Sequence, residues 1–355
     1  RATQQAVMAF THDDVYKPLP GYKVLVSHFH FHLNEQLTDL GTIDFEPTWL
    51  PVFRDLGVNI AILADFHSDS HATDTGKVRL DEQKVYFQGC ERFSDRDLLL
   101  IPGEEPDANF GGHYMFLFPK ALYYTHGKQK TKLPFVEELA GYGKVYHTDS
   151  AADELALLQK EAGLVWQTHP RTKGSTGYPD AVKERDFFKS DRYLGGSFQS
   201  LPVDLSEQRI CEGRCFGLMD DMNNWGAPKY MLAEGDTYMK YPDDETYPQL
   251  MVNYVKLDKV PRFKDGWKPV VDALRAGDHA RGVLIDVAHP KLAAFGFDIG
   301  DVLAVARQIS VRGHDAGEVG AGALAHFAIH VEVRQHALHH VEHRFVQRHI
   351  HHLST

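Results

Sequence analysis

Histidines alternate with phenylalanines directly after an apolar run near the start of the chain. Residues 28–32 read His-Phe-His-Phe-His and follow the run Val24–Ser27. Because side chains of a strand alternate between its two faces, a strand through this segment places the imidazoles of His28, His30 and His32 on one face. Such a face can offer two nitrogen ligands to one metal ion. The alternative is an amphipathic strand whose histidines meet solvent.

Two further apolar runs end in acidic residues. Residues 59–64 lead into Asp65, with His67 two positions later, and residues 97–102 lead through Gly103 to Glu104 and Glu105. The glycine allows the backbone to approach its neighbours closely before the two carboxylates. A turn or helix cap is the alternative interpretation of Asp65, and a solvated loop acid is the alternative for one of the two glutamates.

Two histidines border other apolar runs. His113 follows a Gly-Gly pair and opens the run 114–118, while His169 ends the run 164–168. Pro170 holds His169 in an extended conformation, since proline restricts the residue before it. His113 taken alone is equally compatible with a structural histidine.

The elements that must position these residues form an alternating pattern typical of an α/β fold. The expected strands are residues 23–27, 59–64, 97–102, 114–118, 164–168 and 251–257, and the expected helices are residues 46–56, 81–92, 150–162 and 268–276. In such folds, functional side chains gather where strands end. We therefore expect one site with mixed nitrogen and oxygen donors, a set that suits Zn, Mn or Fe better than Ca or Mg.

Composition excludes several other classes of protein. The 355 residues carry a formal net charge of −11, so a broad basic surface for nucleic acid is not expected, and a small-molecule substrate is. No run approaches the roughly 18 apolar residues of a membrane span, which predicts a soluble protein, cytoplasmic or exported. Three cysteines predict neither a disulfide framework nor a zinc motif. Compartment and oligomeric state are left open by the sequence.

The composition changes near Asp278. Residues 279–355 hold 12 of the 22 histidines and no net charge, and the histidines keep no consistent helical or strand face. We interpret this tail as an out-of-frame or unrelated segment, with a helical tail as the alternative. Residues 1–20 are expected to be a lead-in, the remnant of a preceding domain, and residues 21–278 to form the main domain.

The order and spacing of these motifs resemble the PHP (polymerase and histidinol phosphatase) domain. The resemblance covers roughly residues 20–277 and rests on His-x-His, Asp-x-His, Pro-Gly-x-Glu, a later His and a His-Pro. The chain is most similar to the branch that includes carbaryl-type carbamate hydrolases. The resemblance implies a distorted seven-stranded β/α barrel, two or three divalent metal ions and hydrolysis, of phosphoesters in most members.

The resemblance also implies a set of metal ligands. Two of His28, His30 and His32 match the opening pair, with His30 and His32 favoured if His28 takes the place of the usual acid. The remaining implied ligands are Asp65, His67, Glu105 as a bridge between metals, His113 and His169. The closing Asp-x-His has no intact copy, and Asp221 and Asp236 are equal candidates for its acid. The inserted Phe66 also departs from the pattern, in which Asp directly precedes His.

The metal ions would activate a shared water, so that the resulting hydroxide attacks phosphorus or a carbonyl carbon. Asp65 and Arg171 are the candidate catalytic residues, with Arg171 and Lys173 placed to bind an anionic group or developing oxyanion charge. A solvated pair is the alternative for these two cations.

We expect a metal-dependent hydrolase, with a phosphoesterase favoured over a carbamate or amide hydrolase. One alternative is an amidohydrolase barrel, which opens with His-x-His but usually adds a bridging lysine that has no clear counterpart here. The other is a non-catalytic metal-binding or structural module, which the incomplete closing motif would allow.

Overall fold

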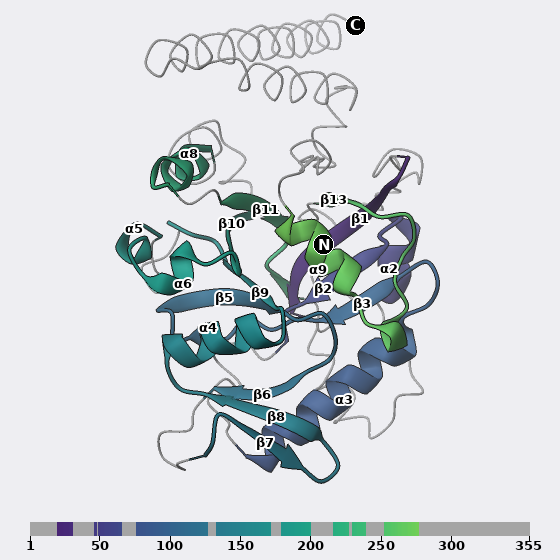
Figure 1. The fold of residues 1–355 in the computed structure, drawn as a ribbon. Coiled ribbons are helices and arrows are strands. Elements are labelled where there is room, and N and C mark those ends of the chain that lie inside the picture. The colour runs from purple at the N-terminus through teal and green to yellow at the C-terminus, as the bar shows by residue number, and fades with distance from the viewer. Residues whose placement is uncertain are drawn as a thin grey trace, which may run out of the picture. The chain divides into compact units, whose positions relative to one another are not determined.

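The computed structural model describes most of the chain up to residue 276. The described residues are 20–30, 46–47, 49–65, 76–126, 133–171, 179–199, 216–226, 229–238 and 252–276. All of them belong to the first of two units into which the chain divides, residues 1–290 (Figure 1). The expected lead-in and the His-rich tail lie almost wholly outside the described residues, so their assignment stays a prediction.

The first sheet carries the opening histidines. Its strands are β1 (Tyr22–His30), β2 (Ile60–Leu63), β3 (Leu99–Pro102), β12 (Thr237–Tyr238) and β13 (Asn253–Lys256). The order is β12-β1-β2-β3, with β13 also paired to β1, and only β13 is antiparallel. Helices α2 (Leu50–Asp55) and α3 (Lys77–Phe93) supply buried residues such as Phe53 and Tyr86 to the core that also holds Val26 and Leu100 of this sheet.

The second sheet has the order β11-β10-β9-β5-β4. Its strands are β4 (Asp107–Ala108), β5 (Gly112–Leu117), β9 (Leu164–Gln167), β10 (Tyr193–Gln199) and β11 (Tyr230–Glu234). Strands β9, β10 and β11 are parallel, whereas β5 runs antiparallel to β9. The start of β5 therefore lies at the carboxyl end of β9, which brings His113 to the same edge as His169.

A third, smaller sheet and the remaining helices complete the described part. The small sheet has the order β6-β8-β7, formed by β6 (Tyr123–His126), β7 (Val136–Leu139) and β8 (Gly143–Thr148). The helices are α4 (Ala151–Lys160), α5 (Pro179–Val182), α6 (Asp186–Lys189), α8 (Phe216–Asn224), α9 (Lys268–Arg275) and the 3-10 turn η3 (Phe263–Asp265). No helix in this part of the chain is long and apolar enough to cross a bilayer.

Backbone hydrogen bonds link the two large sheets at two places. Gly235 N–H donates to Ser27 O at 3.0 Å, next to β11 and β1. Glu104 and Phe116 exchange two backbone hydrogen bonds, at 2.9 and 3.4 Å, which join the end of β3 to β5. One apolar core draws buried side chains from both sheets, among them Ile62, Met115 and Trp166, and α9 adds Val270 to it.

The predicted α/β class is confirmed, and every expected strand and helix has a counterpart in the structure. The seven-stranded barrel is not confirmed, because the described strands are assigned to three separate sheets rather than to one closed sheet. Strands β10 and β11 and the small sheet were not anticipated. Glycines at 195 and 196 and the glutamine and serine of β10 weaken the apolar pattern by which buried strands are identified.

Gly103 is the point at which the chain leaves β3 for the two glutamates. A Cβ at this position would lie 2.5 Å from Leu63 O and 2.8 Å from a methyl carbon of Ile62. The close approach expected from the sequence is therefore present, and no larger residue fits without a shift of the backbone.

We predict that Gly103→Ala lowers the free energy of unfolding by about 1 to 3 kcal/mol, because an overpacked core must distort its neighbours. Gly76→Ser is the control, since a Cβ at Gly76 meets nothing within 4 Å. Chemical denaturation of both variants measures the effect. Equal stability of Gly103→Ala and the wild type would contradict the prediction.

Candidate metal centre

Histidine and carboxylate side chains from distant parts of the chain converge at one edge of the two large sheets. One group of donors comprises His28, His30, Glu105 and Asp236, and a second comprises Glu105, His113 and His169. Within each group, the donor atoms all lie within 4.8 Å of one another. Glu105 belongs to both groups, so the two groups adjoin.

The first group is compact. His28 Nε2 lies 3.0 Å and His30 Nε2 lies 3.1 Å from Glu105 Oε2, and the two nitrogens are 3.1 Å apart. Asp236 Oδ1 is 3.3 Å from His28 Nε2 and 3.6 Å from His30 Nε2. A ring nitrogen carries at most one proton, so His28 Nε2 cannot serve all three neighbours by hydrogen bonds. Convergence of this kind is what a shared cation requires.

The second group uses the other oxygen of Glu105. Glu105 Oε1 lies 3.1 Å from His169 Nε2 and 3.3 Å from His113 Nδ1. The hydroxyl of Thr168 donates to the same oxygen at 2.7 Å. The carboxylate of Glu105 therefore lies between two pairs of imidazoles, one pair on each oxygen.

Unusual backbone conformations position three of the converging residues. Positive φ angles occur at His28 (67°), His169 (31°) and Asp236 (47°), and the described non-glycine residues include only two others, Ala162 and Arg171. The extended conformation expected for His169 before Pro170 is therefore wrong, because this residue lies in the left-handed region. The pairing of β1 with β2 shifts between Ser27 and Phe29, so the strict alternation expected around His28 is interrupted. Strain of this kind persists only where the surrounding structure enforces it, and it is concentrated at functional sites.

Burial and charge act in opposite directions at this cluster. Burial lowers the pKa of His28, but the charges of Glu105, Asp236 and Glu234 outweigh it and raise the pKa well above the ordinary value. Burial raises the pKa of Glu105, yet the facing histidines hold that pKa well below its usual range. The pKa of Asp236 is lowered as well, because the charge of His28 and a hydrogen bond from His30 outweigh its burial. The carboxylates are thus ionised, as metal ligands must be.

The cluster is not equally buried on all sides. The side chains of His28 and Glu105 are 0% exposed, whereas those of Asp236 and His113 are 11% and 14% exposed. Asp236 and His113 are therefore the most accessible donors of the two groups, since His30 and His169 are only 1% and 2% exposed.

Several residues expected at the site lie elsewhere or outside the described residues. Asp221, on α8, accepts a hydrogen bond from Arg171 at 2.8 Å, and Arg171 also pairs with Asp180 at 2.6 Å. Of the two candidates for the closing acid, the structure brings only Asp236 to the cluster. Asp65 is buried at the end of β2 but belongs to neither donor group.

Asp65 lies near α3, since its charge acts on two residues of that helix. Burial, followed by the charge of Asp65, raises the pKa of Tyr86 and of Cys90 on that helix. His32, His67 and Lys173 lie outside the described residues, so their expected roles, and the favoured pairing of His30 with His32, stay predictions.

Sequence reasoning missed two residues that hold the donors in place. Glu234 lies behind His28, with its Oε2 3.0 Å from His28 Nδ1, and Thr168 holds Glu105. Glu234 ends the short apolar run of β11, which is the same signal that marked Asp65 and Glu105. It was overlooked because β11 itself was not anticipated.

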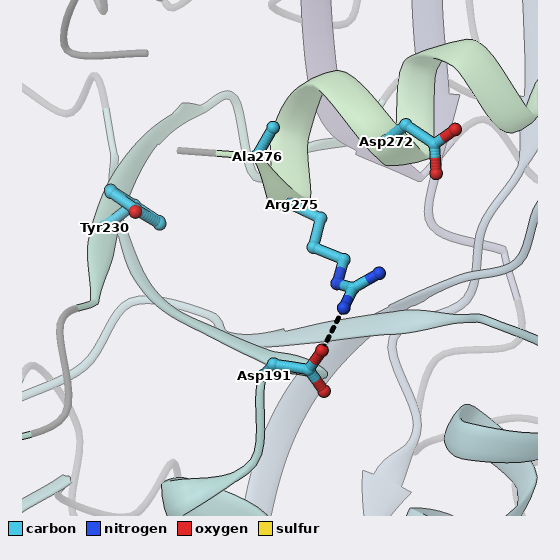
Figure 2. Close-up of a pocket in the computed structure, with 5 residues that line it drawn as sticks. All are labelled: Asp191, Tyr230, Asp272, Arg275 and Ala276. Atoms are coloured by element: carbon cyan, nitrogen blue, oxygen red, sulfur yellow. Dashed lines mark hydrogen bonds and ion pairs between the residues drawn. The ribbon is translucent and has the colours of Figure 1, made fainter. Parts of the chain in front are cut away.

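A separate pocket of about 460 Å³ lies beside α9, lined by Asp191, Tyr230, Asp272, Arg275 and Ala276. Figure 2 shows Arg275 reaching across it to pair with Asp191. Asp191 and Tyr230 precede or begin β10 and β11, so this pocket lies at the opposite ends of these strands from Glu234 and Asp236. Sites in parallel sheets form at carboxyl ends, which favours the donor cluster.

Comparison with protein-family models and with curated proteins found no match. Among solved structures, a two-domain protein from Bacteroides vulgatus, described as containing a predicted PHP-like metal-dependent phosphoesterase, is similar at 14% identity and a TM-score of 0.39, over 76% of this chain and 68% of that one. PsfC from Pseudomonas syringae is similar at 10% identity and a TM-score of 0.39, over 69% and 87%.

Endonuclease Q, solved with a 27-mer duplex substrate, is similar at 12% identity and a TM-score of 0.40. The match covers 72% of this chain but only 57% of Endonuclease Q. A likeness this low does not assign a chemistry to this chain.

We predict that Asp236→Asn weakens binding of the first metal equivalent by about tenfold or more, because it replaces an ionised donor within the cluster. Asp221→Asn is the matched control and should keep wild-type affinity, since Asp221 pairs with Arg171. Titration of metal-free protein with Zn²⁺ measures both. If Asp221→Asn weakened Zn²⁺ binding and Asp236→Asn did not, Asp221 would be the closing acid.

Proposed function

We propose that this protein is a hydrolase that depends on two divalent metal ions, which share the carboxylate of Glu105. The observation that carries the proposal is the position of Glu105 between two pairs of histidines. His28 and His30 lie at its Oε2, and His113 and His169 lie at its Oε1.

The spacing of the first donor group supports cation binding. Donors around a tetrahedral ion with bonds of about 2.0 to 2.1 Å are separated by about 3.3 Å. The four donors that include Asp236 have separations of 3.0 to 3.6 Å among the measured pairs. The mixture of imidazole and carboxylate favours Zn, Mn or Fe over Ca or Mg.

Bound divalent cations supply Lewis acidity, which polarises a phosphoryl or carbonyl oxygen and lowers the pKa of water. The protein contributes the remaining parts of the reaction. Glu105 and Asp236 are held ionised and offset the cationic charge. The donors His28, His30 and His169 are buried, and electrostatic interactions are stronger in a buried environment than in water. Asp236 and His113 border the side from which substrate enters.

Arg171 could bind an anionic group of the substrate only by giving up an existing partner. Its guanidinium is bonded to Asp180 and to Asp221. A substrate phosphate would have to replace one of these carboxylates. Arg171 therefore gives little preference for phosphoesters over neutral carbamates, and we propose both classes, with phosphoesters first because paired cations stabilise attacking and leaving oxygens together.

The two sheet-to-sheet links support a distorted barrel around the common apolar core. Strands β1, β2, β3, β5, β9, β10 and β11 each contribute a side chain to that core. A ring of these seven strands, joined at Ser27 and at Glu104, is the arrangement that we propose. An amidohydrolase is less well supported, because a glutamate rather than a lysine lies between the two donor groups.

The test is metal analysis of the purified full-length chain combined with hydrolysis of an aryl phosphate and an aryl carbamate. We predict at least two metal equivalents, loss of activity on chelation, and recovery with Zn²⁺, Mn²⁺ or Fe²⁺. Glu105→Gln should reduce both metal content and turnover at least a hundredfold, because both donor groups lose a shared ligand.

Glu137→Gln is the matched control, since Glu137 pairs with His147 in the small sheet and belongs to neither donor group. Full activity after complete chelation would contradict a metal-dependent reaction. Tight binding of two ions without hydrolysis of either substrate would instead favour a binding module.

A further inference from the structure

We propose that Glu234 is a positioning residue that fixes the proton of His28 on Nδ1 and thereby turns the lone pair of Nε2 toward the candidate metal centre. The inference rests on the proposed function only in what it says about metal affinity. The hydrogen bond between His28 Nδ1 and Glu234 does not itself require a metal ion.

Glu234 lies among hydrogen-bond donors. His28 Nδ1 is 3.0 Å from its Oε2, and the hydroxyl of Ser197 donates to the same oxygen. The indole Nε1–H of Trp166 donates to Oε1. Glu234 is 0% exposed, and a buried carboxylate is stable only when such donors surround it.

These contacts decide which nitrogen of His28 carries a proton. An ionised carboxylate only accepts hydrogen bonds, so the Nδ1 that faces it must be protonated. When the ring binds a cation, the nitrogen that supplies the lone pair is therefore Nε2. It faces His30 Nε2, Glu105 Oε2 and Asp236 Oδ1, at 3.0 to 3.3 Å.

Without Glu234, the ring has a competing arrangement. A proton on Nε2 could be donated to Glu105 at 3.0 Å, which would close the cluster by an internal hydrogen bond. Glu234 therefore selects the ligand form of His28 over the hydrogen-bonded form. Partners behind metal-binding histidines commonly have this effect.

A glutamine cannot replace Glu234. Its NH₂ group must take the place of one of the two carboxylate oxygens, and both oxygens accept hydrogen bonds from donors. If the NH₂ faces His28 and Ser197, Nδ1 must give up its proton. If it faces Trp166, two donors oppose each other, since an indole nitrogen only donates. Removing the indole donor relieves the second conflict, so Trp166→Phe should restore the function of Glu234→Gln.

The first test is ¹⁵N-histidine NMR of the metal-free protein, with the His28 signal assigned by its loss in His28→Asn. We expect a strongly downfield Nδ1–H proton in the wild type, because it is donated to a carboxylate. The signal should be lost or moved upfield in Glu234→Gln. In Trp166→Phe/Glu234→Gln an Nδ1–H signal should be present again, less far downfield than in the wild type because its acceptor is an amide oxygen.

The second test is titration of the same proteins with Zn²⁺. Glu234→Gln should bind on the order of 10- to 100-fold more weakly than the wild type, and the double variant should recover most of this loss. Glu154→Gln is the matched control, since Glu154 is also buried and lies 3.1 Å from a histidine, His126, that belongs to neither donor group. It should change neither the His28 signal nor Zn²⁺ affinity.

The outcomes separate the two proposals. A wild-type His28 with no proton on Nδ1 would overturn the positioning role, even if Glu234→Gln did not fold. An unchanged His28 signal and unchanged Zn²⁺ affinity in Glu234→Gln would overturn it as well. A wild type that binds no Zn²⁺ but shows the expected Nδ1–H would refute the proposed function and leave the positioning role standing.

Discussion

The site depends on one buried carboxylate that faces four imidazoles. Each oxygen of Glu105 lies within 3.3 Å of two histidine nitrogens, and its side chain is 0% exposed. Such burial is costly for an anion unless positive charge or hydrogen bonds compensate it. The histidines and the Thr168 hydroxyl provide that compensation in the protein, and two cations between these donors would provide more.

The fold places this carboxylate where the ends of strands that are far apart in the sequence come together. Strands β1 and β9, each parallel to a neighbour in its own sheet, end at the site, and β5 begins there because it runs antiparallel to β9. Gly103 permits the close passage of the chain before Glu105. Behind the donors, Glu234 and Thr168 bond to His28 and Glu105 and limit their orientations, so the arrangement requires little reorganisation on binding an ion.

Much of this could be predicted from the sequence, because apolar runs followed by His, Asp or Glu mark strands that end at a polar edge. His28, His30, Glu105, His113 and His169 were found in this way, and the structure brings them together. The bulge at His28 could not be predicted, because it depends on the register of β1 against β2. The choice between Asp221 and Asp236 could not be predicted either, because Asp236 reaches the cluster through a contact with His28, more than 200 residues away. Glu234 was missed because the glycines of β10 and the shortness of β11 hide these strands from pattern analysis.

The sharing of Glu105 by two ions is tested most directly by anomalous X-ray diffraction from crystals of the protein grown with Zn²⁺ or Mn²⁺. We predict two anomalous peaks, one bonded to each oxygen of Glu105, with His28 and His30 at one peak and His113 and His169 at the other. No peak at Glu105, with its oxygens hydrogen-bonded to protonated histidines instead, would contradict it.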